Sequence, residues 1–187
     1  MTRLPLTHRL ATPADFPALE RLIDAASLDL QRPYLSERQI AASRTFMRLD
    51  PRLIADRTYL VAQTETARGA VIVGGGGWRR RTKFFDDSAQ PAEALAPLLD
   101  PSVEPAELRA MYVDPQFTRR GVGRLLVAAC EAGAAAQGFG AMVLAATLAG
   151  EPLYRACGFA PVERYDAMIG EVAVPLVRMR KILCATA

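Results

Sequence analysis

The sequence predicts an α/β fold in which helices flank one mixed, mostly antiparallel sheet of about seven strands. Strand-like and helical segments alternate along the 187 residues. The strand-like segments 108–113 and 141–147 enclose one helix, an order that implies a right-handed crossover and parallel pairing. The strand-like run 58–65 is followed at once by a second such run, which implies an antiparallel hairpin.

A chain of this length can bury roughly 70% of the surface that its unfolded form exposes, so it needs no metal or disulfide to fold. No internal repeat or linker is evident, and we expect a single domain over residues 1–187. The three cysteines, Cys130, Cys157 and Cys184, lie far apart without CxxC spacing. They are typical of reduced thiols in a cytosolic protein, and we expect no metal site.

Charge and hydropathy exclude several classes of protein. The N-terminal segment lacks the unbroken apolar core of a signal peptide, and no segment approaches the roughly 18 apolar residues of a membrane helix. The net charge is +3, and basic residues gather only at 79–81 and 119–124. We therefore expect a cytoplasmic protein without nucleic-acid or membrane partners, and a homodimer is left open.

The first half of the chain begins with a predicted strand at 3–10. Thr12, Pro13 and Asp15 offer an N-cap, a proline at the first helical position and an acidic residue at the third. A helix to about Leu30 follows, with one apolar face formed by Phe16, Leu19, Leu22, Ile23 and Ala26. A second helix is predicted from Ser36 to Asp50-Pro51, carrying Ile40, Phe46 and Met47.

The predicted hairpin consists of strands at 58–65 and 70–73 with a tight connection at 67–69. The four glycines 74–77 close its second strand and favour a bulge or flexible turn, with a second anion-binding turn as the alternative. Residues 82–105 form a long connection in which only 92–99 could be helical.

In the second half, the strand 108–113 ends near Asp114 because Pro115 cannot donate to a sheet. A helix is predicted from Arg120 to about Gln137, with Gly138 ending it. Strands follow at 141–147, 159–165 and 172–182, with a turn from Asp166 to Gly170 between the last two.

The loop before the 120–137 helix is a predicted site for a phosphate-bearing ligand. Gly121 and Gly123 allow close backbone approach, and the first N–H groups of the helix have no intrahelical partners. Arg119, Arg120 and Arg124 add positive charge that matches phosphate oxygens. The residues after Gly123 fit neither the Walker pattern nor the dinucleotide fingerprint.

Residues 118–123, TRRGVG, resemble motif A of the GCN5-related N-acetyltransferases (GNATs), with Thr118 in place of the usual Gln or Arg. A second resemblance, in the order expected for that family, covers Ala145–Leu148, Pro152–Tyr154 and Cys157–Phe159. The match is specific from about Glu107 to Phe159.

The resemblance implies a GNAT-like fold with central parallel strands that splay apart, and acetyl-CoA as cofactor. The pantetheine arm would lie in the opening, as an added strand along β-strand residues Met111, Tyr112 and Val113. The remaining residues implied in cofactor binding are Arg119, Arg120, Gly121, Val122, Gly123, Arg124, Leu125 and Thr147.

The resemblance also implies acetyl transfer to a primary amine by direct attack in a ternary complex. Tyr154 would protonate the departing thiolate, with simple packing as the alternative role. Glu107 is the candidate base, with a solvated strand-end carboxylate or a chain of waters as alternatives.

Trp78, Arg79, Arg80 and Arg81 are the candidate acceptor residues, since they end a strand beside the central one. Their charge favours a small amine that also carries a carboxylate or phosphate, whereas solvated charge beside a packed Trp is the alternative. A non-catalytic acyl-CoA sensor and a protein N-terminal or lysine acetyltransferase remain open as other functions.

Overall fold

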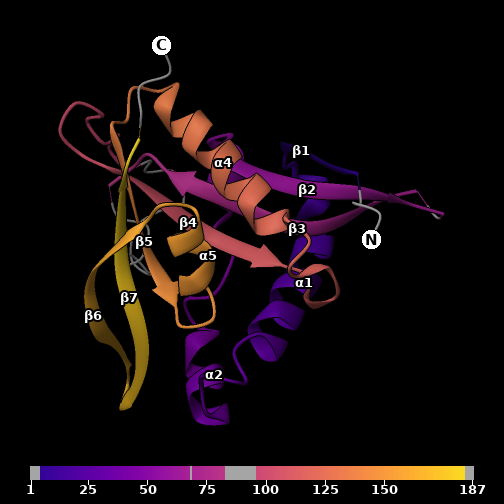
Figure 1. Cartoon of the computed structure of the whole chain (residues 1–187), viewed down its shortest axis with the longest axis vertical. Helices are drawn as coiled ribbons and strands as arrows, with labels where there is room; N and C mark the ends of the chain where they lie inside the picture. The colour runs from indigo at the N-terminus through magenta and orange to yellow at the C-terminus, as the bar shows by residue number, and fades with distance from the viewer. Residues whose placement is uncertain (1–4, 68, 83–95, 184–187) are drawn as a thin grey trace.

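Seven strands form one sheet in the order β1-β2-β3-β4-β5-β7-β6 (Figure 1). The computed structural model describes residues 5–67, 69–82 and 96–183. The pairing of β4 with β5 is parallel and the other pairings are antiparallel, which confirms the predicted mixed sheet. The strands are β1 (Leu6–Leu10), β2 (Tyr59–Thr66), β3 (Gly69–Arg79), β4 (Ala106–Val113), β5 (Ala141–Thr147), β6 (Ala160–Ile169) and β7 (Val172–Ile182).

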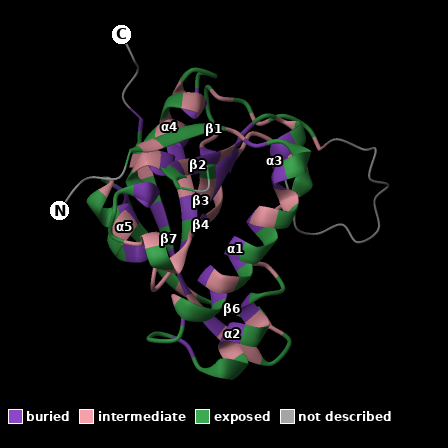
Figure 2. Ribbon diagram, turned by 90° about the vertical axis from the view of Figure 1, so that its right-hand side faces the viewer, coloured by how far each residue is buried: buried purple, intermediate pink, exposed green. Residues whose placement is uncertain are grey.

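Helices cover both faces of the sheet (Figure 2). α4 (Val122–Ala135) and α5 (Glu151–Ala156) lie on one face, which we call the α4 face. α1 (Phe16–Asp29), α2 (Glu37–Ser43) and α3 (Pro51–Ala55) lie on the other, the α1 face. Short 3-10 segments, η1 (Pro13–Asp15) and η2 (Pro115–Phe117), precede α1 and the loop to α4. Among the described residues, no helix combines the length and apolar character needed to cross a membrane.

The start of the first helix follows the predicted capping pattern. The Thr12 N–H and hydroxyl both donate to the Asp15 carboxylate, at 2.7 and 3.0 Å, and Pro13 occupies the first position of η1. α1 then buries Leu19, Leu22, Ile23 and Ala26, as the periodicity indicates.

The prediction of one helix from Ser36 to Asp50 is wrong, because α2 ends at Ser43. The Ser43 and Thr45 hydroxyls donate to the carbonyls of Ile40 and Ala42, an alternative to regular helix bonding. Phe46 and Met47 therefore lie in turns. A separate helix, α3, begins where Asp50 caps Arg52 N–H at 2.9 Å.

The glycine tract does not close a strand as predicted. β3 continues through Gly74–Gly77 to Arg79, because the glycines pair with both β2 and β4. The expected bulge is present as a register shift between Gly75 and Gly77. Packing explains the composition, since a Cβ atom at any of the four glycines would lie less than 3.0 Å from a neighbouring atom.

Two further predictions need correction. β6 extends to Ile169, so the turn lies at Gly170 and Glu171 instead of 166–170. Most of the helix proposed at 92–99 lies outside the described residues, and in its described part Leu98 forms a β-bridge with Arg81. Cys184 also lies outside the described residues, whereas Cys130 and Cys157 are free thiols.

Candidate active site

β4 and β5 begin as neighbours and then separate. In the described part of the chain, their pairing is limited to Ala106 with Met142 and Glu107 with Val143. The C-terminal parts of both strands therefore diverge, as the family resemblance implies. We call this opening the fork, and the backbone of Met111–Val113 lies along its β4 side.

A bulge bends β4 at the fork. Gly75 pairs with Tyr112 and Gly77 with Arg109, so both Ala110 and Met111 stand opposite Gly76. Ala110 has a φ of 49°, in the left-handed region that alanine seldom adopts. The bulge thus coincides with the place where β4 leaves β5.

The start of α4 presents backbone N–H groups and positive charge beside the fork. Gly121 is the N-cap with a φ of 93°, and Arg119 also has a positive φ of 60°. Left-handed residues of this kind are typical of anion-binding turns. The N–H groups of Val122, Gly123 and Arg124 precede the first α-helical bond, which joins Leu125 N–H to the Gly121 carbonyl at 3.0 Å.

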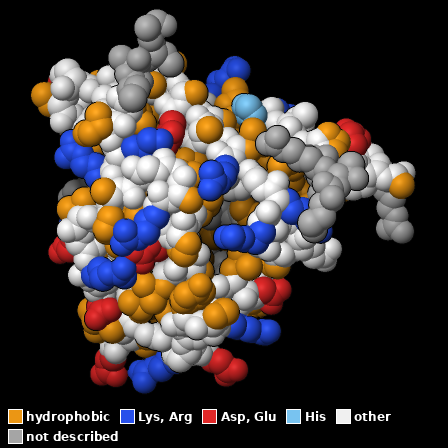
Figure 3. Space-filling model, in the orientation of Figure 1, with side chains coloured by type: hydrophobic (Ala, Val, Ile, Leu, Met, Phe, Trp, Pro, Cys, Tyr) orange, Lys and Arg blue, Asp and Glu red, His pale blue; other side chains and the backbone are white. Residues whose placement is uncertain are grey.

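Figure 3 shows a hollow between the α4 start and α5, bordered by Lys or Arg side chains. Arg120 stacks on the Phe117 ring, with its guanidinium carbon 5.4 Å from the ring centroid. A pyrophosphate group would fit this combination of donors and charge. Gly123 also has a packing role, because a Cβ there would lie 2.7 Å from a Leu153 methyl carbon of α5.

Tyr154 of α5 lies in the core on the α4 face, 8% exposed. Its ring makes an edge contact with Phe159, at 6.0 Å between centroids. Burial raises the pKa of the Tyr154 hydroxyl far above its ordinary value, so the hydroxyl stays protonated at neutral pH.

Thr147 ends β5 and anchors two segments. Its hydroxyl oxygen accepts hydrogen bonds from Gly150 N–H and from Gln31 Nε2, each at 3.2 Å. Gln31 is 4% exposed and its Oε1 has no hydrogen-bond partner among the described residues. This tie holds the α1–α2 connection against the end of β5.

Glu107 is held by two arginines. Arg79 of β3 and Arg109 of β4 each donate to one of its carboxylate oxygens, the second at 2.9 Å. Burial lowers the pKa of Arg79, and the neighbouring Glu107 charge opposes this shift. Because both oxygens already accept charged hydrogen bonds, this arrangement does not favour Glu107 as a proton-accepting base.

The other acceptor candidates lie elsewhere. Trp78 is 3% exposed and packs on Phe139 and on Gly133 of α4. The Arg81 side chain forms an ion pair with Asp56 at 2.7 Å, and Arg80 lies 3.9 Å from the same carboxylate. Of the four, Arg79 alone contacts Glu107, beside the fork.

The α1 face beside the fork is partly open. Ala145 is exposed although it lies in the middle of a central strand, and its neighbour on β7, Arg178, is exposed too. The Arg178 guanidinium pairs with Glu163 at 2.5 Å and lies 5.3 Å from the Tyr165 ring centroid. These residues and Arg109 form a charged surface that we call the open face.

Comparison with known proteins agrees with this geometry. The family model described as acetyltransferase (GNAT) domain matches residues 55–161. The chain belongs to the GNAT acetyltransferase family. Members of this family use acetyl-CoA, and no curated protein matches the sequence of the chain.

Solved GNAT structures share the fold. A GCN5-related N-acetyltransferase from Rhodopseudomonas palustris aligns with a TM-score of 0.68 and 21% identity, covering 98% of this chain and 99% of that one. The yncA protein of Salmonella typhimurium, solved with acetyl-CoA, aligns with a TM-score of 0.61 and 19% identity. That alignment covers 97% of this chain and 96% of the yncA chain. The ribosomal-protein-alanine N-acetyltransferase of Brucella melitensis aligns with a TM-score of 0.60 and 21% identity, covering 95% of this chain and 99% of that one.

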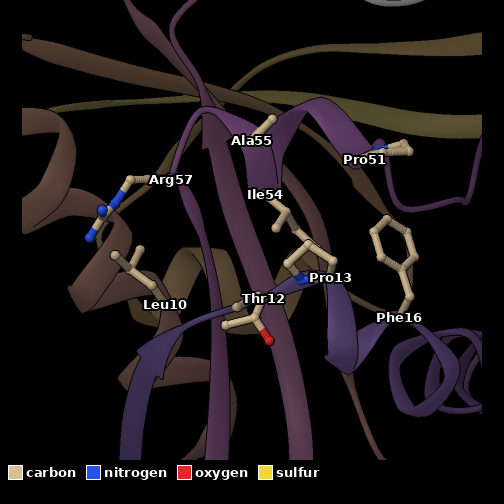
Figure 4. A pocket seen from close by; sticks show the side chains of 9 residues that line it. Leu10, Thr12, Pro13, Phe16, Pro51, Ile54, Ala55 and Arg57 are labelled. Atoms are coloured by element: carbon tan, nitrogen blue, oxygen red, sulfur yellow. The ribbon is translucent and has the colours of Figure 1, made fainter.

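A second hollow of this GNAT protein lies away from the fork. Its volume is about 490 Å³, and Figure 4 shows Phe16 and Pro51 on one side with Leu10 and Arg57 on the other. Its lining residues come from 10–16 and 51–57, none of them from β4, β5 or α4. The fork therefore remains the candidate active site.

Sequence reasoning missed Arg109, Arg178, Tyr165 and Gln31. One signal was available for Arg178, because charged Arg178 and Arg180 alternate with apolar Val177 and Met179 in the sequence. Such alternation indicates that one face of the strand is not covered by a helix.

Proposed function

We propose that this GNAT protein is an acetyl-CoA-dependent N-acetyltransferase that acetylates the primary amine of a small molecule by direct attack in a ternary complex. The fork beside the unpaired N–H groups of α4 carries this proposal, because it offers an extended groove and an anion site in one place. The sheet takes strands from residues 6 to 182, which supports a single domain over the chain.

The residues along the fork fit the cofactor. The N–H groups of Val122–Arg124 and the side chains of Arg119, Arg120 and Arg124 would hold its phosphates, with Gly121 and Leu125 framing this turn. The backbone of Met111–Val113 would hold the pantetheine arm, and Thr147 borders the opposite strand end. Bound acetyl-CoA would supply an acetyl group activated as a thioester.

Tyr154 is the proposed general acid. Like any tyrosine, it carries a proton on Oη at neutral pH, and it follows β5 at the C-terminal side of the fork. A positioned acid of this kind typically contributes about 10²- to 10⁴-fold to rate.

For Glu107 the two arginine contacts support a positioning role. We propose that it orients Arg79 and Arg109 and that the amine proton leaves through water at the open face. This differs from the expectation that Glu107 is itself the base.

The acceptor amine is proposed to carry a carboxylate or phosphate. Arg109 and Arg178 of the open face would offer their guanidinium groups to such an anion, in place of their present partners Glu107 and Glu163. Arg80, Arg81 and Trp78 no longer contribute to this argument, because they are engaged elsewhere.

The test measures release of the CoA thiol with pairs of amines that differ only in a carboxylate, together with polyamines and a peptide that begins with alanine. Calorimetry on acetyl-CoA runs in parallel. We expect turnover with an aminocarboxylate, and Arg178→Ala should lower kcat/KM for it about 10- to 100-fold more than for the matched amine. Arg44→Ala is the control, because Arg44 pairs with exposed Asp24 and belongs neither to the fork nor to the open face.

Other outcomes separate the alternatives. Cofactor binding without thiol release by any amine would indicate a sensor. Preference for the peptide would indicate a protein acetyltransferase. If Arg178→Ala keeps the wild-type ratio of kcat/KM between the aminocarboxylate and the matched amine, the proposal of an anionic acceptor is wrong. The proposal of acetyl transfer would not be affected.

A further inference from the structure

Tyr59 connects three strands from inside the core. It belongs to β2, pairs with Gly77 of β3, and is fully buried. Its hydroxyl donates to the Ala110 carbonyl oxygen of β4 at 2.9 Å. Burial raises the pKa of this hydroxyl well above its ordinary value, so it remains a donor throughout the neutral range.

Two glycines make room for the Tyr59 ring on the α1 face of β3. A Cβ at Gly75 would lie 2.7 Å from the Tyr59 hydroxyl oxygen. A Cβ at Gly77 would lie 2.7 Å from ring atom Cδ2 and 2.8 Å from the Thr58 carbonyl oxygen. Larger residues at either position would displace the tyrosine from the sheet.

The atom that Tyr59 contacts belongs to the bulge. Ala110 keeps its positive φ only where its surroundings enforce that conformation. From the α4 face, the Met111 side chain covers Gly76, where a Cβ would lie 2.0 Å from the Met111 sulfur. Tyr59 and Met111 thus hold the bulge from opposite faces of the sheet.

We propose that Tyr59 is a positioning residue whose hydroxyl fixes the bulge at Ala110 and thereby sets the shape of the fork. The catalytic part of this inference rests on the proposed function, in which the pantetheine arm lies along Met111–Val113, at the end of the bulge. The phosphate site at the start of α4 is separate from it. Loss of the hydroxyl therefore lowers turnover by a larger factor than it lowers affinity for CoA.

The experiment compares Tyr59→Phe with Thr58→Val. Both remove one buried hydroxyl that donates to a backbone carbonyl, and the Thr58 hydroxyl donates to Leu53, away from the fork. We expect Tyr59→Phe to lower kcat about 10- to 100-fold and to weaken CoA binding by a much smaller factor. Hydrogen exchange of the amides in 108–113 should rise in Tyr59→Phe and not in Thr58→Val.

Hydrogen exchange keeps the test independent of turnover, so it decides the matter even if no amine is acetylated. A Tyr59→Phe protein that matches Thr58→Val in both exchange and kcat overturns the proposal. So does an equal fold loss of kcat and of CoA affinity, which would assign Tyr59 to general packing.

A rescue provides the second test. Glycine adopts positive φ freely, so Tyr59→Phe combined with Ala110→Gly should keep the bulge without the hydroxyl. We expect this double variant to fold and to regain most of the lost kcat and exchange protection. Absence of any recovery contradicts the proposal.

Discussion

Tyr154 illustrates how burial changes the acidity of a single residue. The core around it, including Phe159, removes water from the ring and raises the pKa of the hydroxyl. A tyrosine with its ordinary pKa of about 10 is already protonated at neutral pH, and the shift makes the hydroxyl a weaker acid, so its proposed role depends on its position.

We therefore predict that Tyr154→Phe lowers kcat about 10²- to 10⁴-fold and leaves the acetyl-CoA dissociation constant nearly unchanged. Stopped-flow thiol release and calorimetry measure the two quantities. Since the pKa of Tyr154 is raised, its deprotonation should not reduce the wild-type kcat at or below about pH 10. Loss of affinity with kcat intact would assign Tyr154 to packing.

At the scale of elements, the glycine tract of β3 lets both layers of helices approach the sheet. Gly74 faces α4, where a Cβ would lie 2.6 Å from a Val122 methyl carbon. Gly75 faces α1, where a Cβ would lie 2.9 Å from a Leu19 methyl carbon. A strand without side chains thus sets the separation of the layers around the fork.

We predict that Gly74→Ala destabilises the protein by about 1–3 kcal/mol because it overpacks the contact between β3 and α4. Gly140→Ala is the matched control, since no atom of the described residues lies within 4 Å of a Cβ there. That variant should be neutral or more stable by about 0.4–1 kcal/mol, through a smaller entropy of the unfolded chain. Urea denaturation gives the free energy of unfolding of both variants. Equal changes in the two variants would contradict the packing argument.

For the whole molecule, acid stability depends on the ion pair that ties β1 to the start of α1. Arg9 donates to both oxygens of Asp15 at 2.8 Å, and Asp15 is 8% exposed. The hydrogen bonds from Arg9 lower the pKa of Asp15 from 3.8 to about 2, with burial opposing them. Because the folded pKa lies below the unfolded one, this contact stabilises the fold above about pH 4 and stops doing so as pH falls toward 2.

We predict that Asp15→Asn lowers the free energy of unfolding by about 2 kcal/mol at pH 7, and by progressively less between pH 4 and pH 2. Urea titrations across this range give the measurement. Asp24→Asn serves as control, because its pair with Arg44 is exposed and contributes only about 0–1 kcal/mol. A loss in Asp15→Asn that does not depend on pH would contradict this assignment.

The sequence by itself determined the features that depend on short stretches of chain. Asp114-Pro115 ends β4, Gly121 caps α4, and the N–H groups of that helix start are unpaired because of helix geometry alone. The order of strand, helix and strand likewise determined the parallel pair. The turn and helix start of the candidate cofactor site could therefore be predicted from the sequence, whereas the cofactor contacts of its residues stay a prediction.

Tertiary structure alone decided what lines the rest of the site. Tyr59 meets Ala110 and Gln31 meets Thr147 across many intervening residues, and no local pattern reports such contacts. The same holds for Glu107, whose partner Arg79 lies on another strand. Glycines 74–77 suggested a turn because glycine is locally flexible, yet they form a strand because side chains from both faces pack directly against them.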